Sequence, residues 1–182
     1  DVIVVAFLGT QCPLAKLYAG RLQTIADEYA ARGVTVVAIM SNAQDSLSDI
    51  AAYVREHNLK YPVLKDRRNE GADSFAAERT PQVFLLDRER VIRYQGRIDD
   101  QYLVGGQRGE PDRADLRLAI DELLKGQPIT VPNTDAIGCI IGRVREPKEN
   151  SPVTYTHDIA PILQAHCVEC HRAKQIGPFE LT

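Results

Sequence analysis

One stretch near the N-terminus constrains the fold of this chain more than any other. Residues 4–8 are apolar and mostly β-branched or aromatic, Gly9 and Thr10 follow as a small turn, and Cys12-Pro13 opens a helical pattern. An apolar run of this length, closed by a glycine-containing turn, predicts a buried strand. Pro13 suits the first turn of a helix, because its missing N–H group costs nothing there. The stretch therefore predicts a strand, a tight turn and a helix, with Cys12 at the helix N-terminus.

That position matters for the chemistry of Cys12. Unpaired backbone N–H groups and the positive end of the helix dipole favour a thiolate at a helix N-terminus. The thiolate is the reactive form of cysteine, so the position lowers the thiol pKa and raises its reactivity. The alternative is a buried structural cysteine that behaves as a small apolar side chain. A cysteine at a strand-to-helix turn, followed by proline, favours the reactive interpretation.

The following sequence predicts an α/β domain over residues 1–126. Helical periodicity over residues 13–32 leads into a continuous β-branched run at 34–40, typical of a buried parallel strand. A mixed central sheet flanked by helices follows from this order of elements. The remaining predicted elements are helices at about 46–57, 69–77 and 113–125, an extended piece at 61–64, and a hairpin of strands 82–87 and 91–96.

Residues 127–152 differ in character from the domain before them. Four prolines interrupt this stretch and no hydrophobic period survives, which predicts a linker or an extended segment docked on the domain surface. It contains an apolar island at 136–142 that includes Cys139, Ile140 and Ile141. Because exposed isoleucines forgo burial energy, we expect this island to dock on the folded domain.

The pattern of residues 1–126 resembles the thioredoxin-fold redoxins, the group of peroxiredoxin-like and periplasmic thiol–disulfide proteins. The resemblance rests on Thr10-Gln11-Cys12-Pro13 and on Thr80-Pro81, which matches the position of a cis-proline facing the reactive cysteine. It implies that Thr10, Cys12 and Pro81 belong to the site. It also implies either a thiol–disulfide oxidoreductase or a peroxiredoxin-like antioxidant, exported or periplasmic, acting on a thiol or disulfide protein or on a peroxide.

The chain departs from the redoxin pattern at three places. Ala15 stands where a thioredoxin has its second cysteine, and Gly9 stands where a peroxiredoxin has threonine. The opening strand of the fold has no counterpart before Asp1, so we expect the chain to be a fragment. These departures keep open a second hypothesis, a non-catalytic thioredoxin-like binding or scaffold module within a larger multidomain haem protein.

Topology adds one further candidate to the site. The return strand of the hairpin ends at residues 96–100, at the sheet edge that also carries Cys12. Open sheets place functional sites at the carboxyl ends of their parallel strands. Arg97 is therefore a candidate to stabilise the Cys12 thiolate. The alternative is a surface ion pair between Arg97 and Asp99 that contributes little to stability.

A second motif lies in the C-terminal tail. Cys167-Val168-Glu169-Cys170-His171 matches the attachment signature of c-type haem, in which two thiols bind the haem covalently and the histidine ligates iron. Zinc needs four ligands, and here Cys167, Cys170 and either His166 or His171 supply three. A dithiol of the thioredoxin type needs a preceding strand, whereas the preceding residues predict a helix. The signature predicts covalent haem c, with His171 as the metal ligand.

Residues 153–182 resemble the opening part of a cytochrome c domain. This resemblance implies that the whole chain couples thiol redox chemistry to a haem electron-transfer module and its electron-transfer partner. Net charge of -3, without a basic patch, gives no indication of a nucleic-acid partner. No apolar run approaches the length of a membrane span.

Cys139 is the remaining unassigned thiol. If Cys12 is oxidised to a sulfenic acid, a second thiol is needed to resolve it as a disulfide, and Cys139 is the candidate outside the haem signature. The alternative is a buried cysteine that fills space beside the isoleucines of its island. A disulfide with Cys12 requires that the two Cα atoms approach within about 7 Å.

Overall fold

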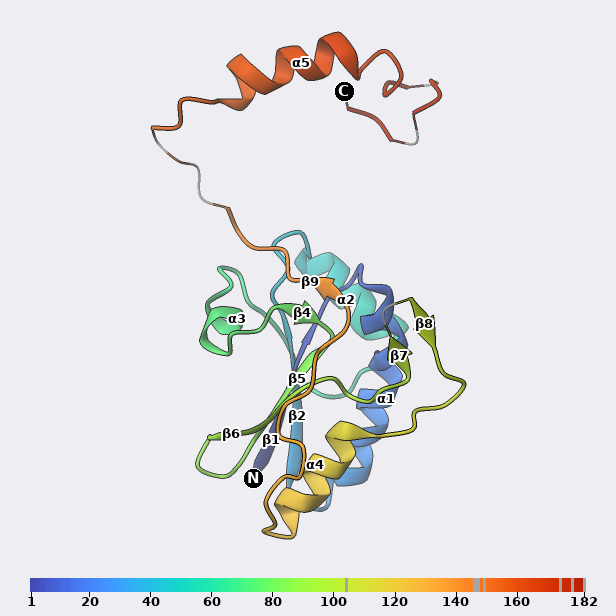
Figure 1. Cartoon of the computed structure of the whole chain (residues 1–182), viewed down its shortest axis with the longest axis vertical. Coiled ribbons are helices and arrows are strands. Elements are labelled where there is room, and N and C mark those ends of the chain that lie inside the picture. Colours follow the sequence, from blue (N-terminus) through green and yellow to red (C-terminus); the bar gives the residue numbers. More distant parts are fainter. Residues whose placement is uncertain (104, 146–147, 149, 174, 178, 182) are drawn as a thin grey trace. The chain divides into compact units, whose positions relative to one another are not determined.

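The computed structural model describes residues 1–103, 105–145, 148, 150–173, 175–177 and 179–181. The chain divides into two compact units, Asp1–Val144 and Arg145–Thr182 (Figure 1). Each unit is described by itself. Within the described part of the chain, no helix is both long enough and apolar enough to cross a membrane.

A five-stranded mixed sheet forms the centre of the first unit, as predicted. Its order is β3-β2-β1-β5-β6. Strands β1, β2 and β3 run parallel to one another, β5 runs antiparallel to β1, and β6 runs antiparallel to β5. The strands are β1 (Val2–Leu8), β2 (Val34–Met40), β3 (Val63–Lys65), β5 (Gln82–Leu86) and β6 (Ile92–Gly96). Because β1 and β2 are parallel and in register from Val2↔Val34 to Leu8↔Met40, their carboxyl ends meet at one edge.

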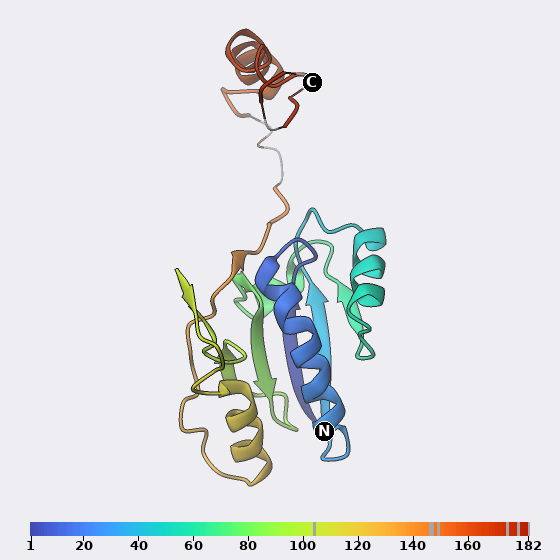
Figure 2. The ribbon, with the colours of Figure 1, turned by 90° about the vertical axis from the view of Figure 1, so that its right-hand side faces the viewer.

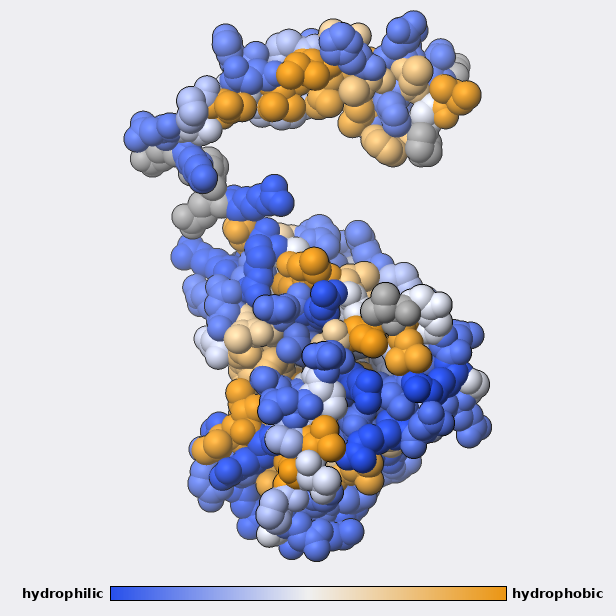
Figure 3. All heavy atoms as spheres, in the orientation of Figure 1, coloured by the Kyte–Doolittle hydropathy of each residue, from blue (hydrophilic) through white to orange (hydrophobic). Residues whose placement is uncertain are grey.

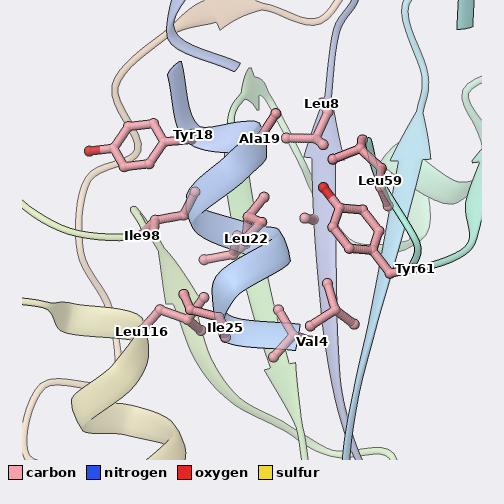
Figure 4. Packing of buried hydrophobic residues seen from close by; sticks show 14 of the residues in the cluster. Val4, Leu8, Tyr18, Ala19, Leu22, Ile25, Leu59, Tyr61, Ile98 and Leu116 are labelled. Carbon is pink, nitrogen blue, oxygen red and sulfur yellow. The ribbon is translucent and has the colours of Figure 1, made fainter. Parts of the chain in front are cut away.

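Helices cover both faces of this sheet (Figure 2). Alternate β1 side chains point to opposite faces, as the period of two in a strand requires. Val4 and Leu8 pack with α1 and α4 in the larger core, shown in Figure 4. Phe7 faces the other way and meets Phe75 and Phe84 in a second cluster of edge-to-face rings. The helices are α1 (Pro13–Ala30), α2 (Leu47–Glu56), α3 (Glu70–Ser74) and α4 (Asp115–Leu124).

Residues 127–144, here called the strap, run back along the sheet after α4 and belong to the first unit. The strap first meets the β6 edge, where Gln95 exchanges backbone hydrogen bonds with Pro132 and Thr134 at 2.9 and 3.0 Å. It then forms β9 (Cys139–Ile140), which pairs antiparallel with β4 (Arg79–Thr80). Ile141, 1% exposed, inserts into the second cluster and anchors this end of the strap.

Two smaller features complete the fold. A short hairpin of β7 (Tyr102–Leu103) and β8 (Gly106–Gln107) lies in a stretch that carries no strand pattern in the sequence. The second unit contains a π-helical turn, η1 (Tyr155–Ile159), continued by α5 (Ala160–His166). The Thr154 side chain caps η1 by accepting a hydrogen bond from the His157 backbone N–H group.

Candidate active site at Cys12

Cys12 lies where the sequence placed it, at the N-terminus of α1. It is the N-cap residue, Pro13 occupies the first turn, and the Cys12 carbonyl accepts the first helical hydrogen bond from Lys16 at 3.1 Å. The Gly9 carbonyl accepts a hydrogen bond from the Cys12 N–H group at 3.2 Å and closes the turn. The side chain is almost fully enclosed, with 2% of the residue exposed. A thiolate here benefits from the helix dipole.

The segment Thr80-Pro81 faces the Cys12 sulfur. The Thr80–Pro81 peptide bond is cis and lies close to Cys12, as predicted. In the thiol form, Cys12 Sγ donates a hydrogen bond to the Thr80 carbonyl oxygen at 2.9 Å. The Thr80 hydroxyl is fully buried and has no hydrogen-bond partner among the described residues. It lies where it can donate to the sulfur once the thiol ionises.

The surroundings of Cys12 lower its pKa. Burial alone would raise the pKa of the Cys12 thiol, because the charged form loses hydration. The Thr80 side chain, the backbone of Ala15 and Cys139, and the Cys139 thiol stabilise the ionised sulfur and outweigh this penalty, so the net pKa of Cys12 falls below the usual cysteine value. The site therefore favours a thiolate, the nucleophilic form.

Cys139 is the second thiol of the site. In the β4–β9 pair it stands directly opposite Thr80, and it is exposed. The neighbouring Cys12 side chain, burial and the negative charge of the Cys12 thiolate all raise the pKa of the Cys139 thiol. The space-filling alternative is wrong, because Cys139 and Ile140 are exposed and Ile141 alone of these three is buried.

Thr10 holds the Cys12 turn in place and makes no described contact with the sulfur. Its hydroxyl and backbone N–H group donate to the Asp45 carboxylate at 2.7 and 3.2 Å. Asn42 donates to the same carboxylate at 3.1 Å and accepts from the Gly142 N–H group of the strap at 2.9 Å. Asp45 was not singled out in the sequence; the available signal was its position just after the 34–40 strand, at the Cys12 edge.

Arg97 does not approach the Cys12 thiol among the contacts described, and neither interpretation of it is correct. Its Nε donates to the buried Asp115 carboxylate at 2.7 Å, and Arg113 donates to the other oxygen at 2.7 Å. Asp99 instead accepts from the Tyr18 hydroxyl at 2.6 Å and forms an ion pair with Arg21. The start of α4 attracts Arg97 because a buried carboxylate needs charge compensation.

The haem signature forms a single turn at the end of α5. Backbone N–H groups of Cys170 and His171 both donate to the Cys167 carbonyl, at 3.2 and 3.0 Å. His171 Nδ1 lies 3.0 Å from the Phe179 carbonyl oxygen. A carbonyl can only accept, so Nδ1 carries the proton and Nε2 is left with its lone pair free for a metal. This arrangement fits a histidine that would ligate iron beside two thiols that would hold a haem.

Zinc is the alternative to haem that the sequence left open for the second unit. Among the described residues, no three His, Cys, Asp or Glu side chains gather into a metal-binding group. Apolar side chains are exposed in this unit, including Ile159, Ile162 and Phe179. Figure 3 shows hydrophobic residues on the visible surface of this unit. A flat apolar macrocycle would cover such side chains, whereas a zinc ion would not.

Comparison with known proteins places this site in a family. Residues 1–95 match the AhpC/TSA family model. A hypothetical protein from Sinorhizobium meliloti 1021 is 35% identical over 80% of this chain and 81% of its own, with a TM-score of 0.72. An uncharacterized conserved protein from Geobacillus kaustophilus is 29% identical over 80% and 79%, also with a TM-score of 0.72. Among curated proteins there is no match.

A more distant likeness establishes the fold class. A structure named as a candidate thiol:disulfide interchange protein DsbE, from Chlorobium tepidum, is 20% identical over 68% of this chain and 80% of its own. Its TM-score is 0.56. The first unit therefore has a mixed α/β, thioredoxin-like fold, with a central sheet flanked by helices.

Proposed function

This chain belongs to the AhpC/TSA family, and from that premise we propose that it catalyses thiol–disulfide exchange with Cys12 as the reactive thiolate. One observation carries the proposal: the enclosed Cys12 sulfur lies at the positive end of α1 and against Thr80, whose buried hydroxyl has no hydrogen-bond partner among the described residues and is free to donate to a thiolate. Both stabilise negative charge on sulfur, and a thiolate is the species that attacks or leaves a disulfide.

A second thiol near Cys12 serves both exchange with disulfides and the resolution of a sulfenic acid left by a peroxide, and the choice between them depends on the charge around Cys12. A second thiol, Cys139, stands beside the sulfur, which is the requirement for passing a disulfide on. Arg97, the cation that the sequence predicted near Cys12, forms an ion pair with Asp115 instead. The substrate proposed for this site is therefore a thiol or disulfide of a partner protein.

The pH dependence of Cys12 alkylation separates a redox enzyme from a scaffold. The rate of Cys12 alkylation is measured at each pH by peptide mapping. We expect the pH at which this rate is half-maximal to lie below the pKa of about 8.5 of free cysteine, and the rate to fall as the pH drops through that midpoint. Thr80→Val should raise the midpoint by about one pH unit, since a hydrogen bond to a charged group contributes about 1.5 kcal/mol. Thr24→Val, on the exposed side of α1, serves as the matched control.

A midpoint near that of free cysteine in the parent protein would contradict the catalytic proposal. It would favour the scaffold hypothesis, in which the domain keeps its fold but Cys12 is an ordinary buried thiol. An unchanged midpoint in Thr80→Val, with a low midpoint in the parent, would remove Thr80 from the site and leave the helix N-terminus as the cause.

We propose further that the second unit binds haem c, which Cys167 and Cys170 would hold covalently and whose iron His171 would ligate. When bound, haem supplies one-electron transfer to a partner protein. The hydrogen bond from His171 Nδ1 to the Phe179 carbonyl supports this assignment, because it orients the ring and leaves Nε2 for the metal. We place the protein outside the cytoplasm, in the periplasm or an equivalent compartment, where disulfides persist.

Haem attachment has a direct test. Produced in cells that mature c-type cytochromes, the chain should retain haem after denaturation and acid extraction, because thioether bonds survive both treatments. Replacing Cys167 and Cys170 together by alanine should abolish retention, whereas Cys139→Ala, which removes a cysteine outside the signature, should not affect it. Equal loss of haem from all of these proteins on extraction would contradict covalent attachment.

A further inference from the structure

The strap brings a second thiol to Cys12 by a specific backbone contact. In the antiparallel β4–β9 pair, Cys139 is the register partner of Thr80, and Thr80 is the residue whose carbonyl accepts the Cys12 thiol proton. Facing Cα atoms in such a pair lie about 4.5–5.5 Å apart. Cys12 and Cys139 therefore both lie against Thr80, and each thiol affects the pKa of the other.

Gly138 makes this close approach possible. Its φ is +154°, in the region that favours glycine, and a Cβ atom on it would overlap the Thr80 carbonyl oxygen. On the other side of Cys139, Ile141 is buried and Gly142 exchanges hydrogen bonds with Asn42 and Ala43. Cys139 is thus held between two anchored positions, so its place beside Cys12 is built into the packing of the strap.

The two thiols differ in exposure and in acidity. Cys12 is 2% exposed and its pKa is lowered, whereas Cys139 is exposed and its pKa is raised. In a disulfide between them, the sulfur that an external thiolate can reach is that of Cys139. The sulfur that leaves best is that of Cys12, because a thiol of lower pKa is the better leaving group. Exposure and acidity therefore favour the same direction of attack.

Resting on the proposed function, we propose that Cys12 and Cys139 form a reversible intramolecular disulfide whose exposed Cys139 sulfur is attacked by thiols of a partner. The first partner thiolate forms a disulfide with Cys139, and the Cys12–Cys139 bond breaks to release the Cys12 thiolate. A second partner thiolate then attacks the partner sulfur and releases the Cys139 thiolate. Two partner thiols are oxidised to one disulfide, and the Cys12–Cys139 disulfide is reduced to two thiols.

The test uses the full chain with Cys167 and Cys170 replaced by serine, so that two thiols remain, and glutathione as the probe. After treatment with oxidised glutathione, non-reducing peptide mapping should find Cys12 linked to Cys139. After brief exposure to reduced glutathione and an acid quench, the trapped glutathione should be on Cys139. When Cys12→Ser is added to this background, oxidised glutathione should modify Cys139. When Cys139→Ser is added instead, modification of the enclosed Cys12 should be about tenfold slower than modification of Cys139 in the Cys12→Ser variant.

The outcomes separate the two proposals. Glutathione bound to Cys12 without any Cys12–Cys139 link would overturn the disulfide pair and leave the proposed function intact. Trapping on Cys12 in the parent would overturn the proposed direction of attack. A Cys12 that neither links to Cys139 nor takes up glutathione would contradict the proposed function itself.

A glycine substitution tests the strap without removing either thiol. Gly138→Ala should slow formation of the Cys12–Cys139 disulfide by about tenfold or more, because displacement by about 1 Å from a reactive geometry is costly. Gly109→Ala is the matched control, since a Cβ atom there meets nothing within 4 Å. Equal rates of disulfide formation in Gly138→Ala and the parent would overturn the role of the strap contact.

Discussion

Replacement of Cys12 by serine is expected to reduce catalysed thiol–disulfide exchange to the uncatalysed rate. The assay follows disulfide formation in a synthetic dithiol peptide with oxidised glutathione as the electron acceptor. Serine keeps the size of the side chain and its place at the start of α1, but its hydroxyl forms no disulfide. Catalytic turnover requires a sulfur that is both a nucleophile and a leaving group, and the surroundings of Cys12 lower the pKa of its thiol.

The double variant Cys167→Ser/Cys170→Ser is the control for this experiment. It removes the other cysteine pair and should keep full exchange activity, because those thiols belong to the second unit. If Cys12→Ser turned over the peptide as fast as the parent, the reactive cysteine would have to lie elsewhere in the chain. Running the same proteins with hydrogen peroxide as the acceptor would show whether peroxide reduction accompanies exchange.

Replacement of Asp45 by alanine is expected to lower the free energy of unfolding by about 3 kcal/mol or more. The Asp45 carboxylate is buried and accepts three hydrogen bonds, two from Thr10 and one from Asn42. Alanine would leave these three donors without a partner, and each unsatisfied buried group costs about 1–3 kcal/mol. The Cys12 turn and the strap both depend on this carboxylate, the strap through the bond between Asn42 and Gly142.

Urea denaturation measures this effect, with the midpoint and the slope followed separately. Asp27→Ala is the matched control, because Asp27 is an exposed carboxylate on α1 whose described contact is with Gln23, four residues earlier. Exposed substitutions of this kind usually change stability by less than about 0.5 kcal/mol. A change in Asp45→Ala no larger than that of the control would show that water replaces the carboxylate at no cost.

Local patterns in the sequence were sufficient to predict the architecture around Cys12. The apolar run of β1, the turn at Gly9 and the Cys12-Pro13 start of α1 each depend on backbone preferences and on periodicity, which act over a few residues. The cis bond at Pro81 and its closeness to Cys12 were predicted from the resemblance to redoxins. The haem signature is equally local, and covalent haem stays a prediction for the attachment experiment.

The partners of Arg97, Asp45 and Cys139 were decided by the tertiary structure. Arg97 and Asp99 lie on the predicted sheet edge. Arg97 pairs with the buried Asp115 at the start of α4. Asp99 accepts a hydrogen bond from Tyr18 and forms an ion pair with Arg21, both of α1. Hydropathy and periodicity show which face of an element is buried. They do not show which charged group from another element will meet it there.

Cys139 shows the same limit most clearly. Its apolar island predicted docking, and the sequence left open whether Cys139 would approach Cys12 or pack among isoleucines. The position was decided by the backbone pairing of β9 with β4, which sets Cys139 opposite Thr80 and turns Ile141 into the second core cluster. A strand register depends on contacts between segments far apart in sequence, so a shift of one residue would have exchanged the buried and exposed side chains of the strap.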